Sequence, residues 1–206
     1  DEFPEFDRRT KESLRQPLED GVITISRAGG SLTYPSNIMV VAAMNPCPCG
    51  YFGHPAHECR CTSKQVKTYL GKISGPVLDR IDMHIEVAPV DFSELSSARK
   101  EESSADIRKR VISAREIQTE RFKNSDTKCN ANMTPAEIEK FCGLSPALNQ
   151  KLMKAFEKLE LSARAYHKIL KISRTVADLE GSENISEKHI FQAVQYRSLD
   201  RKYWFR

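Results

Sequence analysis

The chain contains 206 residues, of which 39% are hydrophobic and 29% are charged, and its formal net charge is +4. This composition is typical of a folded, water-soluble protein and excludes an intrinsically disordered chain. The longest apolar run covers residues 38–44, far fewer than the roughly 20 residues that a membrane span needs. The chain opens on Asp-Glu without a secretory leader, which predicts a cytoplasmic protein and suggests a fragment or a processed product.

The charge is distributed unevenly along the chain. Residues 1–92 carry 10 basic and 12 acidic side chains, a net charge of −2, whereas residues 93–206 carry 22 and 16, a net charge of +6. A stretch rich in Ser and Glu at residues 93–104 has the composition of a linker. We therefore predict two domains, residues 1–92 and residues 93–206.

The first domain begins with a predicted helix and a predicted hairpin. The helix is expected over residues 8–19, although Pro17 should end or kink it near Gln16. The β-branched segment 22–25 and the segment 31–34, joined across a Gly-Gly pair, predict a β-hairpin.

Two further segments of this domain have strand patterns. The continuous apolar run at residues 38–43 predicts a strand buried on both faces, as in a parallel sheet. Residues 81–87 alternate apolar and polar side chains, which predicts a half-buried strand at a sheet edge. Together these elements predict part of an α/β core with a few parallel strands.

The second domain is predicted to be a helical bundle. A helix over residues 104–122 places four apolar side chains on one face: Ile107, Val111, Ala114 and Ile117. Further helices are expected to start at four N-terminal signals: Thr134-Pro135 with a capping-box Glu137, Ser145-Pro146, Ser162 and Ser186. The fold class is therefore α/β plus all-α.

The first two residues could take part in phosphoryl transfer. An Asp-Glu pair at the end of a strand can hold Mg²⁺ through the Asp and polarise an attacking water through the Glu. Asp1-Glu2 has this pattern, but an acidic pair at a solvated chain end is a common alternative. The phosphate-binding motif G-x-x-x-x-G-K-[ST] is absent, because Ile73 follows Gly71-Lys72 and Val66 stands where the first Gly belongs.

Asn45 and Arg80 are the next candidates. Asn45 follows the predicted buried strand, at the sheet edge where α/β proteins bind ligands, and its amide could position a water; a turn residue is the alternative. Arg80 lies between Asp79 and Asp82, which indicates either a local ion pair or an arginine finger that donates to a neighbour's nucleotide.

The cysteines form two close pairs, Cys47-Pro48-Cys49 and Cys59-Arg60-Cys61. Disulfides are not expected in a chain without a leader. The four thiols could hold a structural Zn²⁺, with His54 or His57 able to replace one of them, although paired zinc ligands usually have two or more residues between them. Four reduced thiols are the alternative.

The basic residues of the second domain leave three interpretations open. Arg108, Lys109, Arg110 and Arg115 could form a solvated helix face, contact nucleic-acid phosphates, or meet the acidic first half of a neighbouring subunit.

Taken together, the motifs resemble those of the magnesium-chelatase-like AAA+ ATPases of the ComM/YifB family, over essentially the whole chain. The resemblance rests on five segments, in the family's order: DEFPEF at 1–6, LRQPLEDG at 14–21, AMNPCPCG at 43–50, SGPVLDRID at 74–82 and LSARAY at 161–166. It implies that Asp1 and Glu2 are the Walker B acids that bind Mg²⁺-ATP and activate water, that Asn45 is sensor 1, that Arg80 is the arginine finger and that Arg164 is sensor 2.

The resemblance also implies an assembly and a substrate. Residues 22–34 would be a hairpin that points into the pore of a ring, expected to be a homo-hexamer, and Arg27 near its tip would contact DNA, or else be a solvated turn residue. ATP hydrolysis would drive DNA unwinding and branch migration during natural transformation. The family's N-terminal domain and Walker A loop have no counterpart in the sequence, so the chain alone is not expected to hydrolyse ATP.

Two alternatives remain open from the sequence. One is a motor subunit like that of magnesium chelatase itself, against which the C-x-C pair after Asn45 argues. The other is a zinc-stabilised basic module that binds nucleic acid without catalysis.

Overall fold

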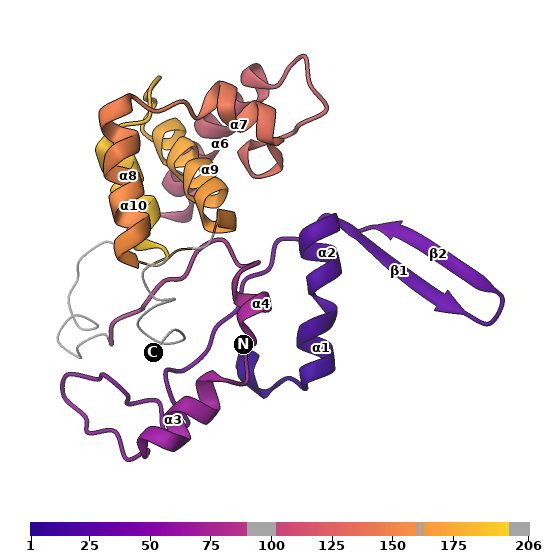
Figure 1. Cartoon of the computed structure of the whole chain (residues 1–206), viewed down its shortest axis with the longest axis vertical. Helices are drawn as coiled ribbons and strands as arrows, with labels where there is room; N and C mark the ends of the chain where they lie inside the picture. Colours follow the sequence, from indigo (N-terminus) through magenta and orange to yellow (C-terminus); the bar gives the residue numbers. More distant parts are fainter. Residues whose placement is uncertain (90–101, 160, 162, 198–206) are drawn as a thin grey trace. The chain divides into compact units, whose positions relative to one another are not determined.

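The computed structural model describes residues 1–89, 102–159, 161 and 163–197 of the chain (Figure 1). These residues form two compact units, one that runs from Asp1 through Met83 and one that begins at His84. Most of the predicted linker lies outside the described residues, and a domain boundary at residue 92 stays a prediction. None of the described helices combines the length and the apolarity needed to cross a membrane.

The N-terminal unit opens with the 3-10 helix η1 (Phe3–Glu5), followed by α1 (Arg8–Ser13) and α2 (Arg15–Asp20). The predicted interruption of the long helix is confirmed, but it falls at Leu14 rather than near Gln16. The reason is that Pro17 is the third residue of α2, so its ring would collide with the carbonyl four residues earlier, at the end of α1.

The predicted hairpin is confirmed. Strands β1 (Val22–Arg27) and β2 (Gly30–Pro35) pair antiparallel, and a two-residue turn closes them. Gly21 ends α2 in the left-handed conformation, with φ at 65°, and leads directly into β1. The hairpin projects from the helices of its unit, and nearly all of its side chains are exposed (Figure 1).

The other two strand predictions, both within the residues that the structure describes, are wrong. Residues 38–43 and 81–87 form neither helix nor strand, and Met39, Val41 and Val87 are 89%, 84% and 84% exposed. A strand needs a hydrogen-bonded neighbour, and β1–β2 is the only sheet among the residues that the structure describes. Both segments have the apolar pattern of a strand, but no partner strand meets them, and the few parallel strands expected of the α/β core are not formed.

The rest of this unit consists of α3 (Ser63–Leu70), α4 (Gly75–Leu78) and connecting loops. Its apolar residues form two small clusters. One contains Phe3, Ile73, Val77 and Leu78; the other contains Cys47, Val66, Tyr69 and Leu70. Met44 packs against both clusters, so the chain just before Asn45 joins them.

The C-terminal unit is helical, as predicted. Its elements are α6 (Ser104–Arg121), η2 (Asn130–Asn132), α7 (Pro135–Phe141), α8 (Pro146–Leu159), α9 (Ala163–Leu179) and α10 (Glu187–Gln195). The expected starts of α7, α8, α9 and α10 agree with these bounds. Helix α9 crosses the core, where Ile169 and Ala177 are fully buried.

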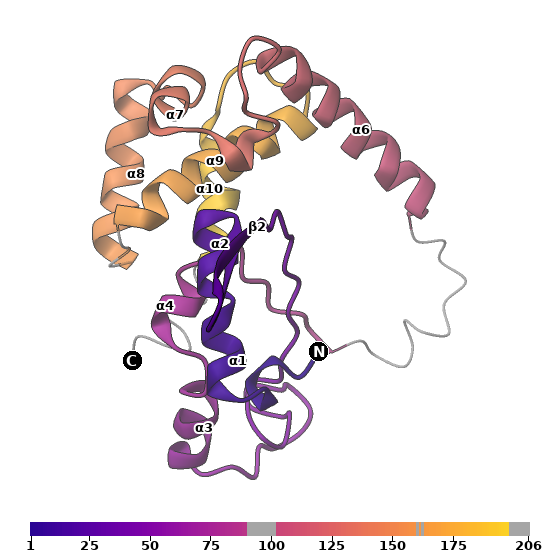
Figure 2. The same ribbon diagram turned by 90° about the vertical axis from the view of Figure 1, so that its right-hand side faces the viewer.

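The predicted apolar face of α6 is only partly correct. Ala114 is buried, whereas Ile107, Val111 and Ile117 are between 37% and 46% exposed. Figure 2 shows the reason: only the C-terminal part of α6 lies against the other helices of its unit, and its first turns extend beyond them.

A buried polar network centres on Asp178 of α9. Its carboxylate accepts hydrogen bonds from Arg121 Nη1 and Asn130 Nδ2, both at 2.7 Å, and from Arg174 Nε at 3.1 Å. Arg174 also donates to the carbonyls of Ser182 and Glu183, beyond the end of α9. The network therefore connects α6, η2 and the loop that follows α9.

Candidate functional site

The N-terminal unit contains a pocket of about 500 Å³. Nine residues line it: Glu2, Glu5, Asn45, Pro48, Lys64, Gln65, Thr68, Tyr69 and Lys72. Two candidates from the sequence, Glu2 and Asn45, thus lie on the wall of one pocket although 43 positions separate them. Asp1, the third candidate from this region, is not among the lining residues.

Glu2 and Asn45 are brought together by the chain segments that carry them. The Phe3 amide donates to the Ala43 carbonyl at 3.0 Å, and the Phe3 side chain is buried in the adjoining cluster. Glu2 itself is in the left-handed conformation, with φ at 49°, and its amide donates to Asp1 Oδ1 at 2.8 Å. Both acidic side chains are exposed, so a ligand can reach their carboxylates from solvent.

The opposite wall of the pocket is helix α3 and the turn after it. Thr62 begins α3 with a capping box in which Thr62 and Gln65 bond each other's backbone amides. Tyr69 belongs to the last turn of α3 and, like Asn45, lines the pocket. Burial and the nearby Glu5 carboxylate raise the pKa of Tyr69, so the phenol stays protonated.

Lys72 is one of several pocket residues that the sequence did not reveal, together with Lys64, Gln65, Thr68 and Tyr69 of α3. Its ammonium group lies 2.8 Å and 2.9 Å from the two carboxylate oxygens of Glu5 and 5.3 Å from the centre of the Tyr69 ring. Gly71-Lys72 is not a phosphate-binding motif. Lys72 nevertheless lines the pocket, because it follows the end of α3 at Leu70. No local signal predicts a contact with a residue 67 positions away.

The predicted arginines lie outside the pocket. Arg80 follows α4, where its guanidinium pairs with the Glu19 carboxylate and donates to the Pro76 carbonyl at 2.7 Å. This ion pair joins Arg80 to a residue 61 positions away, so it differs from the local pair that the neighbouring Asp79 and Asp82 suggested. Arg27 is the last residue of β1 and is exposed, and Arg164 is exposed on α9 in the other unit.

Two basic residues of α6 are neutralised by acidic residues nearby in the sequence, one inside the helix and one just before it. Lys109 pairs with Asp106 at 2.9 Å, and Arg110 pairs with Glu102 at 2.7 Å. All four side chains are exposed. Of the three interpretations of this basic run, the local pairs favour a solvated helix face.

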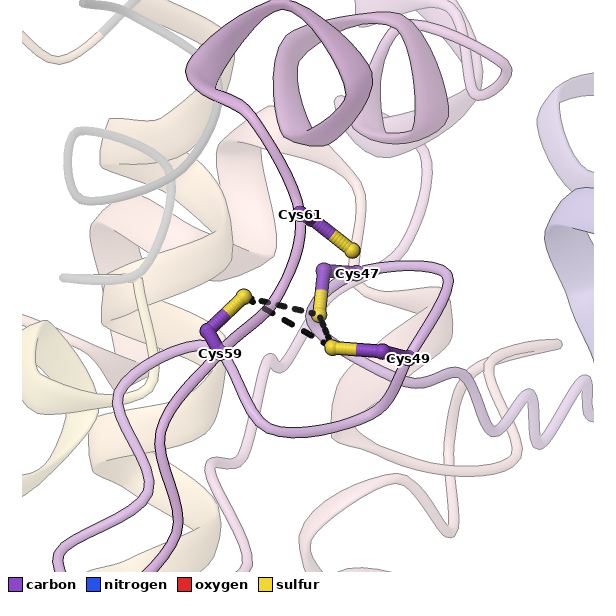
Figure 3. A group of neighbouring side chains, drawn as sticks. All are labelled: Cys47, Cys49, Cys59 and Cys61. Atoms are coloured by element: carbon purple, nitrogen blue, oxygen red, sulfur yellow. Dashed lines mark hydrogen bonds between the residues drawn. The ribbon is translucent and has the colours of Figure 1, made fainter.

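The four paired cysteines converge, as Figure 3 shows. The sulfur of Cys47 lies 3.4 Å from that of Cys49 and 3.7 Å from that of Cys59, and the sulfurs of Cys49 and Cys59 are 3.6 Å apart. With Cys61 included, all four sulfurs lie within 4.8 Å of one another. None is in a disulfide, which would need an S–S distance of about 2.05 Å.

The loop between the two pairs is built for close approach of the sulfurs. The Gly50 amide closes a turn on the Cys47 carbonyl at 3.1 Å, and Gly50 has φ at 82°, a left-handed conformation that favours glycine. Backbone amides of Tyr51 and Arg60 donate to Cys49 and lower the pKa of its thiol to about 6. Burial and the neighbouring thiols instead raise the pKa of Cys59 and Cys61, so the suitability of the cluster for a thiolate-binding metal ion rests on the convergence of its four sulfurs.

The remaining candidate ligands lie outside this cluster. His54 Nδ1 accepts the amides of Ala56 and His57 within the loop, and the two histidine rings contact Tyr51 and each other in edge-on and tilted arrangements. Cys129 donates to Asn132 Oδ1 at 2.9 Å. Cys142 is buried in the helical core, where burial raises the pKa of its thiol to about 11.

Comparison with known proteins agrees with the resemblance seen in the sequence. The family model described as magnesium chelatase, subunit ChlI, matches residues 1–95, and the model of the ChlI C-terminal region matches residues 101–197. Over 202 residues, 98% of the chain, the sequence is 44% identical to the competence protein ComM of Haemophilus influenzae and 43% identical to YifB of Salmonella typhimurium. The chain belongs to the magnesium-chelatase-like ComM/YifB family.

Nearly all of the chain matches these relatives, but it covers only part of each of them. The chain spans 38% of the length of ComM and 39% of the length of YifB. A more distant relative, Mb2921c of Mycobacterium bovis, is 33% identical over 96% of this chain. The matched region is 39% of the length of that protein. The chain therefore spans well under half of the length of these relatives.

Proposed function

We propose that the chain is the C-terminal part of a ring-forming AAA+ ATPase that couples ATP hydrolysis to DNA remodelling. The observation that carries the proposal is the presence of Glu2 and Asn45 on one pocket wall, in a chain of the ComM/YifB family. The loop that cradles the phosphates would come from the remaining length that the relatives have and this chain does not span.

The donor set of the pocket suits a magnesium nucleotide. Carboxylates are the oxygen ligands that Mg²⁺ prefers, and the exposed ammonium groups of Lys64 and Lys72 offer charge to phosphate oxygens. When bound, Mg²⁺-ATP supplies the phosphoryl group that passes to water. Asp1 would hold the metal or its water, Glu2 would take a proton from the attacking water, and the Asn45 amide would orient that water.

The arginines would act at the boundaries of the site. Arg80 would reach the nucleotide of a neighbouring subunit, which requires its guanidinium to exchange the Glu19 carboxylate for a phosphate oxygen. Arg164 would act as sensor 2 from the helical unit. In a homo-oligomeric ring, with a hexamer as the proposed size, each site would thus need more than one part of the assembly.

The DNA-binding element would be the hairpin. It projects from its unit with exposed side chains, and Arg27 lies beside its turn, where a cation can contact a phosphate (Figure 1). We propose that hydrolysis moves this hairpin and that the complete protein promotes branch migration of DNA. The H. influenzae relative is named a competence protein, which supports this proposal.

The cysteine cluster would hold a structural zinc ion. Four thiolates in a closed set leave no open position for substrate, so the ion would stabilise the loop and would not take part in hydrolysis.

The decisive experiment measures ATP hydrolysis and DNA unwinding by the full-length protein and by its Glu2→Gln and Arg80→Ala variants. We expect both variants to lose at least 100-fold in hydrolysis, because each removes a group that acts on the transferring phosphoryl. Lys67→Met, which removes an exposed cation of α3 outside the pocket, is the control. Hydrolysis by Arg80→Ala at the parent rate would contradict the arginine-finger assignment.

The same assays separate the alternatives. We expect the 206-residue chain alone to show no turnover, and tight ATP binding by it would contradict that expectation. A zinc-dependent basic module would instead bind DNA as this chain, with no effect of Glu2→Gln. A chelatase-type motor would hydrolyse ATP without unwinding DNA.

A further inference from the structure

The cysteine cluster and the pocket share the chain segments that build them. Cys47 stands two residues after Asn45, and Pro48 between the first two cysteines itself lines the pocket. At the other end of the loop, Cys61 directly precedes Thr62, the residue that begins α3. Each pair of sulfurs is therefore attached to one wall of the pocket.

Three of the four sulfurs are spaced as a tetrahedral metal site demands, and that of the fourth, Cys61, lies within 4.8 Å of them. With Zn–S bonds of about 2.3 Å, the sulfurs of a regular tetrahedron lie about 3.8 Å apart. The three distances among Cys47, Cys49 and Cys59 are 3.4–3.7 Å, so a zinc ion would need little movement of the chain.

The apolar packing between the two walls is small. Cys47 is fully buried against Val66, Tyr69 and Leu70 of α3, and this cluster holds only these four buried residues among those that the structure describes. Tyr69 of this cluster also lines the pocket together with Asn45. So small an apolar cluster gives little stability by itself, and cross-links commonly supply the rest in units of this kind.

We propose that a zinc ion bound by Cys47, Cys49, Cys59 and Cys61 fixes helix α3 against Asn45 and thereby forms the pocket wall. The ion is a positioning element: it acts on Asn45 through two residues of backbone and on Tyr69 and Lys72 through α3. That the wall serves a nucleotide rests on the proposed function; that the metal forms the wall does not. Metal loss would then loosen Asn45 and α3 together and leave the helical unit unchanged.

The test compares the zinc-loaded chain with the same protein after chelation and after zinc is returned. Elemental analysis is expected to give one zinc per chain. Hydrogen exchange of the amides of Asn45 and α3 is expected to accelerate at least tenfold on chelation and to recover with zinc, while the amides of α9 keep their rates. Unchanged exchange rates of the α3 amides after chelation of zinc-loaded protein would overturn the inference. So would less than one zinc per chain in protein prepared with excess metal.

Variants of the cluster make the test independent of the chelator. Cys61→Ser is expected to lose zinc and to show the fast exchange, whereas Cys61→His keeps four ligands and should restore both zinc and protection. Cys129→Ser removes a thiol outside the cluster and is the matched control. If these exchange results hold but zinc loss leaves the ATP affinity of the full-length protein unchanged, the nucleotide site is wrong and the positioning role stands.

Discussion

The ammonium group of Lys72 bonds both carboxylate oxygens of Glu5, at 2.8 Å and 2.9 Å, and so ties the turn after α3 to the 3-10 helix at the start of the chain. The two side chains are 40% and 53% exposed, and ion pairs with that exposure contribute little to folding. Both residues nevertheless line the pocket. The pair therefore places a cation and an anion on the pocket wall, and breaking it would change the folding stability little.

The first prediction concerns this lysine. Lys72→Met should change the free energy of unfolding by less than about 1 kcal/mol, because the pair is exposed. In the full-length protein it should weaken ATP binding roughly tenfold, since a charged hydrogen bond to phosphate contributes about 1.5 kcal/mol. Urea unfolding and equilibrium binding measure the two effects. Lys67→Met, an exposed position of α3 outside the pocket, controls for loss of charge, and equal ATP affinities of the two variants would contradict the assignment.

Features encoded locally were predictable from the sequence. The hairpin follows from β-branched segments around a Gly-Gly pair. The starts of α7 and α10 follow from Thr134, whose hydroxyl accepts the Glu137 amide, and from Ser186, whose own amide donates to His189 Nδ1 three residues later. Such signals depend on neighbours in the sequence and are independent of the rest of the fold. The convergence of the cysteines was predictable for the same reason, because a short Gly-containing loop separates the two pairs.

Features that depend on distant partners were not predictable. The run at residues 38–43 has the pattern of a buried strand, but the pattern cannot supply the neighbour that a strand requires. Lys72 likewise carries no motif, and it became a pocket residue only because α3 lies opposite Glu5. The sequence therefore predicts the secondary structure that a segment favours better than it predicts the distant residues that the segment contacts.

The second prediction concerns the buried network of the helical unit. Asp178 is fully buried between Arg121 and Arg174, so Asp178→Ala would leave two guanidinium groups without their anion and should destabilise the unit by about 3–5 kcal/mol. The exposed pair of Lys151 and Glu187 provides the control, and Glu187→Ala should cost less than about 1 kcal/mol. Thermal and urea unfolding of both variants measure the difference, and similar losses would show that the network is not essential.

The third prediction concerns acid stability. Glu137 accepts hydrogen bonds from the Thr134 amide and from the hydroxyls of Ser125 and Thr127, which lower its pKa from 4.5 to about 2. Because the folded pKa lies below the unfolded one, the carboxylate stabilises the fold above pH 4.5, and this contribution is lost as the pH falls towards 2.

Glu137→Gln should therefore lower stability at pH 7 and flatten the dependence of stability on pH between 4.5 and 2. Unfolding curves recorded across that interval measure the slope. Glu139→Gln, an exposed position of the same helix, is the control. A Glu137→Gln slope that matches the parent would mean that another carboxylate governs acid unfolding.

The last prediction concerns DNA binding by the full-length protein. Arg27 is exposed beside the hairpin turn, so Arg27→Ala should leave the folding stability within about 0.5 kcal/mol of the parent. If Arg27 binds a phosphate of double-stranded DNA, the slope of log affinity against log salt concentration should become shallower by about 0.9 in this variant, because one fewer phosphate is neutralised. Arg9→Ala removes the same charge from α1, outside the hairpin, and should keep the parent slope. DNA binding measured at several salt concentrations gives the slope of each variant. A contact made by the hairpin changes the slope of Arg27→Ala alone, whereas a general charge effect would change both slopes alike.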